Sequence, residues 1–267
     1  EELNKDDYVA STWDNFAQAL EAAKAVLDLD DATQAEIEAA EENLQKAMEA
    51  LLSKTGWQVI NGQKYYYGED GTKKTGWQEI DGKKYYFGEE NDGAMKTYWQ
   101  QIDGKWYFFG NDGVMRTYWQ KIWGKWYFLG NASDGAMKTG WQKIWGKWYY
   151  LGSANDGAMK TGWQQVYGKW YYLGFAEDGS MKTYWQQING KWYFFGGADD
   201  GAMKTGWQKI WGKWYYLGSA NDGAMKTGWQ KINGKWYYFG GEQDGSMKSN
   251  VWVGDYYLDN SGVWSKT

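Results

Sequence analysis

The sequence of 267 residues contains no cysteine, no histidine and no proline. Without cysteine there is no disulfide framework and no thiolate metal site. Without histidine, a Ser-His-Asp triad and any zinc site that uses an imidazole are excluded. No run of 18 or more apolar residues is present, so we expect no membrane insertion. These absences favour binding or structural roles over catalysis.

Charge and aromatic content divide the chain into two parts. Residues 1–54 carry 14 Asp and Glu against 4 Lys, a net charge of −10, whereas residues 55–267 carry 20 acidic and 25 basic residues, a net of +5. The second part also holds most of the 22 Trp and 23 Tyr. We therefore predict a domain at 1–54 and a second at 55–267.

The first part reads as a two-helix hairpin. Apolar residues between Tyr8 and Leu27 recur at the i, i+3, i+4, i+7 spacing of an amphipathic helix. A turn follows, and Thr33 with Glu36 fits a capping box that starts a second helix, which runs to about Leu52. Two helices bury little surface alone, so we expect them to need a third element.

This segment resembles the helical module called FIVAR. The resemblance is carried by Tyr8, Trp13, the stretch Leu20-Glu21-Ala22-Ala23-Lys24 and the turn Asp31-Ala32-Thr33-Gln34. It implies a unit of three helices, of which residues 1–54 would hold two.

From Thr55 onward the sequence repeats. A lead Trp recurs every 20–23 residues, at positions 57, 77, 99, 119, 141, 163, 185, 207, 229 and, in a degenerate copy, 252. In each unit two short aromatic-rich runs flank a two-residue turn that ends in Gly, which is a strong signal for a β-hairpin. We predict a mainly β fold, a tandem β-hairpin solenoid of about nine repeats of 20–22 residues plus a cap, preceded by the two-helix hairpin.

Alternation along the strands places the aromatic rings on defined faces. With the turn of one hairpin at Asp103-Gly104, Trp99 pairs with Phe108, and Trp99, Trp106 and Phe108 share one face. Two Trp seven residues apart on facing strands then form two walls of a groove. The next hairpin is expected to supply the third wall.

Comparison among the repeats selects that third wall. The residue eight positions after the lead Trp is always Tyr, although its two successors vary among Tyr, Phe and Leu. A nearly regular Met would suit the floor of such a site.

Three aromatic faces fit a quaternary ammonium group or a sugar ring, at roughly 0.5–2 kcal/mol per well-placed ring, so each site alone would bind in the millimolar range. Linked sites on a multivalent polymer gain ~10²–10⁴ in avidity.

The unit at 139–161, Thr-Gly-Trp-Gln-Lys-Ile-x-Gly-Lys-Trp-Tyr-Tyr-Leu followed by Asp-Gly-Ala-Met-Lys-Thr, resembles the cell-wall-binding repeat of the choline-binding proteins of Gram-positive bacteria and their phages. The resemblance implies a secreted, extracellular protein at the bacterial cell surface. It implies binding of choline groups on teichoic acids, at sites between successive hairpins. The aromatic cages implied in this sequence are Trp99, Trp106 and Tyr127; Trp119, Trp126 and Tyr149; Trp141, Trp148 and Tyr171; Trp163, Trp170 and Tyr193; Trp185, Trp192 and Tyr215; and Trp207, Trp214 and Tyr237.

The sequence departs from this pattern in three places. Lys64 and Lys84 replace the second Trp of the first two repeats, and we expect no choline site there because a cation in the wall repels choline. The last unit is shortened and is expected to cap the stack, so Trp229 and Trp236 are not counted among the cages. Four aromatic residues occupy hairpin turns, where they suggest either a sugar-stacking platform or contact with another hairpin: Trp123, Trp145, Tyr167 and Trp211.

Two further hypotheses for the function stand beside choline binding. A polysaccharide such as an α-glucan or a host glycan is the second hypothesis, carried by the two Lys-bearing repeats and the turn aromatics. A passive spacer is the third. A calcium site at Asp199-Asp200-Gly201 is less favoured than a turn that needs Gly. We expect no enzyme, no cofactor and no metal. We also expect no nucleic-acid partner, because a net charge of +5 over more than 200 residues is too low to bind a polyanion. A homodimer through an end hairpin is left open.

Overall fold

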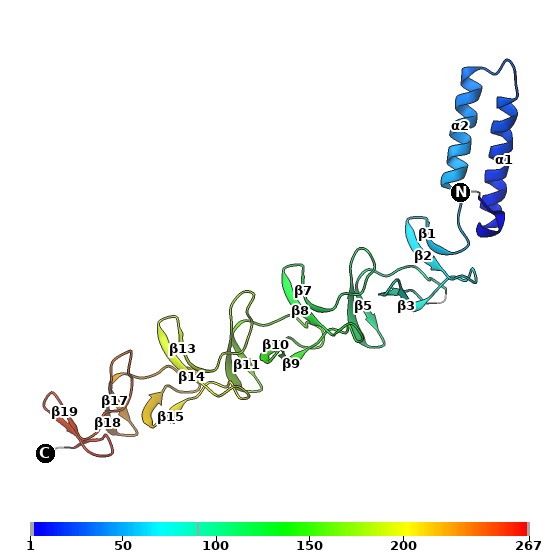
Figure 1. Ribbon diagram of the computed structural model, residues 1–267. Coiled ribbons are helices and arrows are strands. Elements are labelled where there is room, and N and C mark those ends of the chain that lie inside the picture. Colours follow the sequence, from blue (N-terminus) through cyan, green and yellow to red (C-terminus); the bar gives the residue numbers. More distant parts are fainter. Residues whose placement is uncertain (1–2, 90, 266–267) are drawn as a thin grey trace. The chain divides into compact units, whose positions relative to one another are not determined.

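A computed structural model describes residues 3–89 and 91–265. Backbone contacts divide it into two compact units, each containing successive hairpins (Figure 1). The first unit holds the chain up to Thr117 together with Asn131–Ala136, and the second holds Tyr118–Gly130 and the chain from Met137 onward.

The chain begins with the short 3₁₀ turn η1 (Lys5–Asp7) and two antiparallel helices, α1 (Ala10–Leu27) and α2 (Gln34–Glu49). The capping box at the start of α2 is confirmed. The Thr33 hydroxyl accepts from the Glu36 amide (3.3 Å), and the Glu36 carboxylate accepts from the Thr33 amide (2.9 Å). Both exchanges satisfy backbone N–H groups that the first helical turn leaves without partners.

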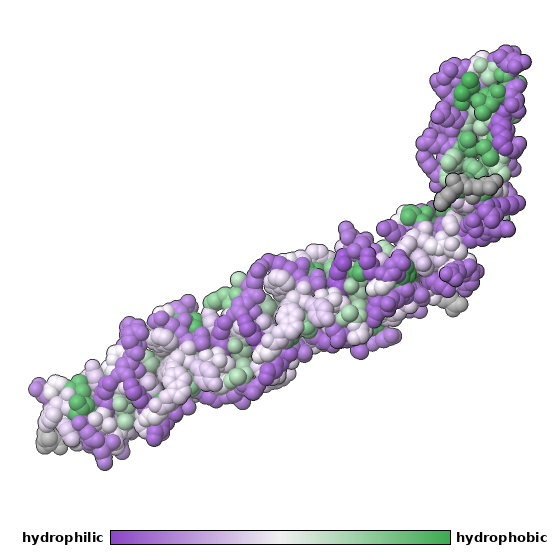
Figure 2. All heavy atoms as spheres, viewed as in Figure 1, coloured by the Kyte–Doolittle hydropathy of each residue, from purple (hydrophilic) through white to green (hydrophobic). Residues whose placement is uncertain are grey.

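The two helices bury little, as the sequence predicts. Phe16 and Ala19 are their buried side chains, while Leu27 and Met48 remain exposed, and Figure 2 shows apolar patches on this segment. The segment after α2 runs back beside the residues that precede α1. The Val9 amide donates to the Leu52 carbonyl (2.8 Å), and the Lys54 amide donates to the Asp7 carbonyl (2.7 Å). Among the described residues, no helix is long and apolar enough to cross a membrane.

The rest of each unit is a series of antiparallel hairpins, which confirms the predicted fold class. Those of the first unit are β1 (Gly56–Ile60) with β2 (Gln63–Tyr67), β3 (Gly76–Ile80) with β4 (Lys83–Phe87), and β5 (Tyr98–Ile102) with β6 (Lys105–Phe109). Those of the second unit are β7 (Tyr118–Ile122) with β8 (Lys125–Leu129), β9 (Gly140–Ile144) with β10 (Lys147–Leu151), β11 (Gly162–Val166) with β12 (Lys169–Leu173), β13 (Tyr184–Ile188) with β14 (Lys191–Phe195), β15 (Gly206–Ile210) with β16 (Lys213–Leu217), β17 (Gly228–Ile232) with β18 (Lys235–Phe239), and the three-stranded end of β19 (Val251–Val253), β20 (Tyr256–Leu258) and β21 (Trp264–Ser265).

The predicted hairpin register is confirmed. In β5–β6 the Cα partner of Trp99 is Phe108 and that of Gln101 is Trp106. The turn residues Asp103 and Gly104 both have positive φ, 49° and 75°, the backbone shape that a tight two-residue hairpin requires. Because register fixes which face each side chain takes, the two Trp of a hairpin lie on the same side.

The core of each hairpin lies on the opposite face. In β5–β6, Ile102, Tyr107 and Phe109 are buried in one cluster with Met115. From the second hairpin onward, the last residue of the second strand is wholly buried, and it varies between Phe and Leu: Phe87, Phe109, Leu129, Leu151, Leu173, Phe195, Leu217, Phe239 and Leu258. Apolar volume rather than shape decides this position, which explains its tolerance of both side chains.

Within each unit, the linkers, meaning the segments between hairpins, bond to the preceding hairpin. In the second unit the amide of Met203, after β13–β14, donates to the carbonyl of Trp170 in β12 (2.7 Å). The side chain of this Met lies beneath the next linker, where a Cβ on Gly223 would stand 2.3 Å from its sulfur. Gly223 also has φ +62°, so both its backbone and its contact favour glycine.

Candidate functional site

Six hairpins, from β5–β6 to β15–β16, each present two Trp rings that stand nearly perpendicular to each other. The lead Trp lies on the first strand and the second Trp on the second strand, with interplanar angles of 84–86°. The ring centroids are separated as follows: Trp99–Trp106 6.5 Å, Trp119–Trp126 6.4 Å, Trp141–Trp148 6.5 Å, Trp163–Trp170 6.3 Å, Trp185–Trp192 6.4 Å and Trp207–Trp214 6.2 Å. The shared hairpin register places both Trp on one face in all six hairpins.

The structure brings the Tyr selected from the sequence against the lead Trp of the preceding hairpin. In the second unit the centroid separations are Trp119–Tyr149 5.0 Å, Trp141–Tyr171 4.8 Å, Trp163–Tyr193 4.9 Å, Trp185–Tyr215 5.0 Å and Trp207–Tyr237 4.9 Å. Two Trp and one Tyr thus form a three-sided aromatic corner. For the pair Trp99 and Trp106 the expected third residue, Tyr127, belongs to the other unit, and its place in that cage stays a prediction.

The strict Tyr occupies a position shared by two hairpins. Tyr193 is on the core face of β13–β14 and packs in a cluster with Tyr172 and Phe195, while its ring also meets Trp163. Burial raises the pKa of the Tyr193 phenol, with the nearby Asp222 carboxylate acting in the same direction. The phenol is therefore neutral at physiological pH.

A cavity of about 330 Å³ lies in this corner at Trp163, Trp170 and Tyr193. Met203 lines it as well, in the position expected for a floor. Its rim comes from Asn221 and Asp222, in the linker that follows the hairpin two further along. The cavity size falls near the lower end for small-molecule sites, and planar apolar walls with a few polar rim groups suit a small organic cation.

The next cavity, about 260 Å³ at Trp185, Trp192 and Tyr215, gains another ring. Trp211, from the turn of β15–β16, also lines it and meets Phe194 edge-on, at 6.2 Å and 90°. The side chain is still three-quarters exposed (76%) and has φ 47°, a backbone region that costs an aromatic residue strain. Sequence interpretation did not include Trp211 among the site residues.

The turn aromatics therefore differ from one another. Trp211 and Trp145 contact the preceding hairpin, Trp145 through Phe128 at 6.3 Å, as one of the two sequence hypotheses expected. Tyr167 is 89% exposed. Neither the sugar-stacking hypothesis nor any ligand is needed to explain Trp145 and Trp211, because the ring contacts offset part of the backbone strain.

Several second Trp rings have an ammonium group from the facing strand close to them. Lys121 lies 5.8 Å from the centroid of Trp126, and Lys143 lies 5.7 Å from that of Trp148. Lys209 and Lys231 lie likewise over Trp214 and Trp236, each at 5.9 Å. These rings already attract a cation within the chain, as the quadrupole of indole predicts.

The first two hairpins keep the Trp and Tyr contact but lack the second Trp. Trp57 meets Tyr85 at 5.0 Å and Trp77 meets Tyr107 at 4.9 Å, both edge-on. Lys64 and Lys84 stand where the second ring would be. The corner is therefore two-sided at both positions.

The C-terminal end forms a pocket that sequence interpretation left out. Trp229, Trp236, Tyr256 and Trp264 line a cavity of about 310 Å³. Tyr256 precedes the buried Leu258 by two residues, the same offset as the strict Tyr of every full repeat, and this offset could have revealed it. Trp264 comes from β21, a strand that no other repeat possesses, so the repeat pattern carries no signal for it.

Tandem hairpins whose junctions form aromatic corners define a class of repeat proteins that bind small cationic groups. The profile described as "Choline-binding repeat" matches residues 54–99, 97–139, 138–184, 182–227 and 204–252, and the chain belongs to this family. The profile of the FIVAR domain matches residues 1–52.

Solved structures of Streptococcus pneumoniae proteins are similar to this chain. CbpJ from strain TIGR4 is 30% identical with a TM-score of 0.60, over 80% of this chain and 94% of that one. Choline binding protein F is 33% identical with a TM-score of 0.59, over 80% and 93% of the two chains. The choline-binding domain of CbpL is 35% identical with a TM-score of 0.50, over 73% and 98%. No curated protein matches the chain significantly.

Proposed function

We propose that this protein binds the choline groups of cell-wall teichoic acids, one group in each aromatic cage, without catalysing a reaction. The observation that carries the proposal is the repeated corner of two perpendicular Trp and one Tyr, with Trp–Trp separations of 6.2–6.5 Å and Trp–Tyr separations of 4.8–5.0 Å. A trimethylammonium group is weakly hydrated and makes no hydrogen bond, so ring faces are its natural partners.

Repetition turns weak cages into firm attachment. Each cage is expected to bind free choline in the millimolar range, and a polymer that engages several cages gains ~10²–10⁴. The protein would then remain at the surface of a choline-bearing bacterium, outside the cell. One structure of choline binding protein F, 33% identical over 80% of this chain, was determined in the presence of a peptidoglycan analogue, which supports a cell-wall ligand.

The test is calorimetric titration with choline and with 3,3-dimethyl-1-butanol, its uncharged isostere. Choline is expected to bind at several sites in the millimolar range. The isostere is expected to bind at least about 10-fold more weakly, because only the cation gains from the ring quadrupoles. Equal binding of both compounds would show that the cages are merely hydrophobic. Absence of choline binding up to about 0.1 M would refute the proposal.

Trp211 is expected to tighten the cage at Trp185 and Trp192. Trp211→Asn should weaken choline there by about 2- to 30-fold, the contribution of one ring. The reciprocal change Asn189→Trp should tighten the cage at Trp163 and Trp170, which has Asn at this turn. Indole ¹H–¹⁵N NMR signals, assigned by single Trp→Phe changes, report each cage. Unchanged affinities in both variants would remove Trp211 from the site.

A further inference from the structure

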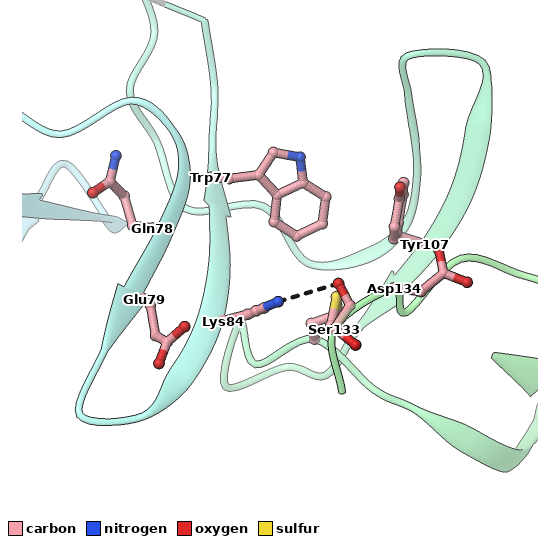
Figure 3. A pocket seen from close by; sticks show the side chains of 8 residues that line it. Trp77, Gln78, Glu79, Lys84, Tyr107, Ser133 and Asp134 are labelled. Carbon is pink, nitrogen blue, oxygen red and sulfur yellow. Dashed lines mark hydrogen bonds between the residues drawn. The ribbon is translucent and has the colours of Figure 1, made fainter. Parts of the chain in front are cut away.

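The pocket of the second hairpin, β3–β4, is built differently from the cages. It has a volume of about 380 Å³ and is lined by Trp77, Tyr107, Met115, Glu79, Lys84 and Asp134, among others. Figure 3 shows Lys84 extending below the ring of Trp77, with Glu79 on one side and Tyr107 and Asp134 on the other. One aromatic wall of a cage has become a set of charged groups.

Two positions that face each other have changed together. Lys84 pairs in register with Glu79. In the seven hairpins that have a second Trp, the residue opposite that Trp is Gln or Lys: Gln101, Lys121, Lys143, Gln165, Gln187, Lys209 and Lys231. In the first hairpin, Lys64 faces Val59. A carboxylate therefore accompanies the ammonium only in the second hairpin.

The ammonium of Lys84 is held at the edge of the pocket. Its Nζ donates to the carbonyl of Ser133 at 3.3 Å, a long bond that uses one of its three N–H groups. The facing Glu79 offers only acceptor oxygens when ionised. The opposite formal charges of this pair add no net charge to the pocket, while the pair supplies one donor group and one acceptor group to its lining.

The remaining aromatic wall is rigid and open. Trp77 meets Tyr86 at 5.3 Å and Tyr107 at 4.9 Å, both edge-on, and these contacts fix the plane of its ring. The side chain nevertheless keeps 37% of its surface exposed. A flat ring fixed on one side and accessible on the other is a platform for the apolar face of a ligand.

We propose that this pocket binds a neutral sugar ring of a cell-surface glycan, by stacking on Trp77 and hydrogen bonding to Glu79 and Lys84. Each sugar hydroxyl both donates and accepts, so the hydroxyls of one ring can use both the carboxylate and the ammonium that line this pocket. The trimethylammonium head of choline makes no hydrogen bond to this pair, and in this pocket it would also lose a ring wall. An anionic sugar would meet two carboxylates, Glu79 and Asp134, against one ammonium. This site is additional to the choline cages and does not depend on them.

The experiment uses the full chain with its cages saturated by choline and follows the indole signal of Trp77 by ¹H–¹⁵N NMR. Maltotriose and triacetylchitotriose are the two neutral probes. At least one of the two sugars is expected to shift the Trp77 signal saturably. The double change Glu79→Gln with Lys84→Met is expected to weaken the binding of that sugar about 10-fold, as expected for two lost hydrogen bonds. Binding unaffected by this double change would overturn the proposal, as would no saturable shift with either probe up to about 0.1 M.

A matched transfer of the pair tests the same idea elsewhere. Gln165→Glu with Trp170→Lys recreates the pair in the sixth hairpin, where the lead ring is Trp163. This variant is expected to lose choline binding at that cage and to show a sugar-dependent shift of Trp163. Loss of choline without any gain of sugar would assign the pair a structural role and contradict the proposal. Choline titration of the unaltered cages serves as the folding control and tests the choline proposal separately.

Discussion

Choline binding at one cage is expected to weaken about 10-fold when Trp170 is replaced by alanine, while the other cages keep their affinity. The ring of Trp170 supplies one of three walls, worth roughly 0.5–2 kcal/mol. Its backbone carbonyl, which accepts from the Met203 amide at 2.7 Å, is retained in the variant. The linker should therefore stay in place and only the wall be lost. The indole signal of Trp163, at 6.3 Å from Trp170, reports this cage.

The control is Trp170→Phe, which keeps an aromatic face and should recover most of the affinity. The remaining indole signals serve as internal references, because repeats in a solenoid contact mainly their neighbours. If every cage lost choline together, the sites would not be independent. If the Trp163 titration were unchanged, Trp170 would not be a wall of the cage.

Replacing Phe195 by alanine is expected to destabilise its hairpin by about 3–5 kcal/mol, the usual cost of emptying a buried aromatic site. Phe195 is fully buried and packs with Tyr172 at 6.4 Å and Trp163 at 5.6 Å. Amide hydrogen exchange should show protection in β13–β14 reduced by about 10²–10⁴-fold. Because Phe195 supports Trp163, the cage of that Trp should bind choline more weakly as well.

Phe195→Leu is the matched control, since Leu occupies the same position in the hairpins ending at Leu129, Leu151, Leu173 and Leu217, where it is also fully buried. Its cost should stay below about 1.5 kcal/mol. A cost for Phe195→Leu as large as for Phe195→Ala would mean that ring shape, rather than apolar volume, holds the hairpin together. Equal protection in all three proteins would place the core elsewhere.

Register was predictable because it is a local property. A two-residue turn such as Asp103-Gly104 fixes which residues face each other, and alternation then fixes the face of each side chain. The pairing of Trp99 with Phe108 and the common face of the two Trp follow directly. The strict Tyr was found from its invariance within the chain, which marked a position with two sets of neighbours.

Contacts that depend on how hairpins stack were not predictable in the same way. Trp211 reached the cage of Trp185 and Trp192 from a turn, where the local pattern shows only an unfavourable aromatic residue. Trp264 joined the last pocket through β21, which has no counterpart in the repeats. Glu79 is visible in the sequence as a departure from the Gln or Lys of the repeats that have a second Trp. That it lines a pocket is not visible there, because part of the lining comes from the linker at Ser133.

The sequence by itself determined the hairpins, their register, the common face of the two Trp and the helix start at Thr33, because each depends on residues within one hairpin or one helical turn. Only the tertiary structure decided which surfaces enclose space. A linker two hairpins along supplies the rim at Asp222, and a neighbouring turn supplies Trp211. These contacts depend on the rotation from one hairpin to the next, an angle set by many small packing terms that no short stretch of sequence encodes.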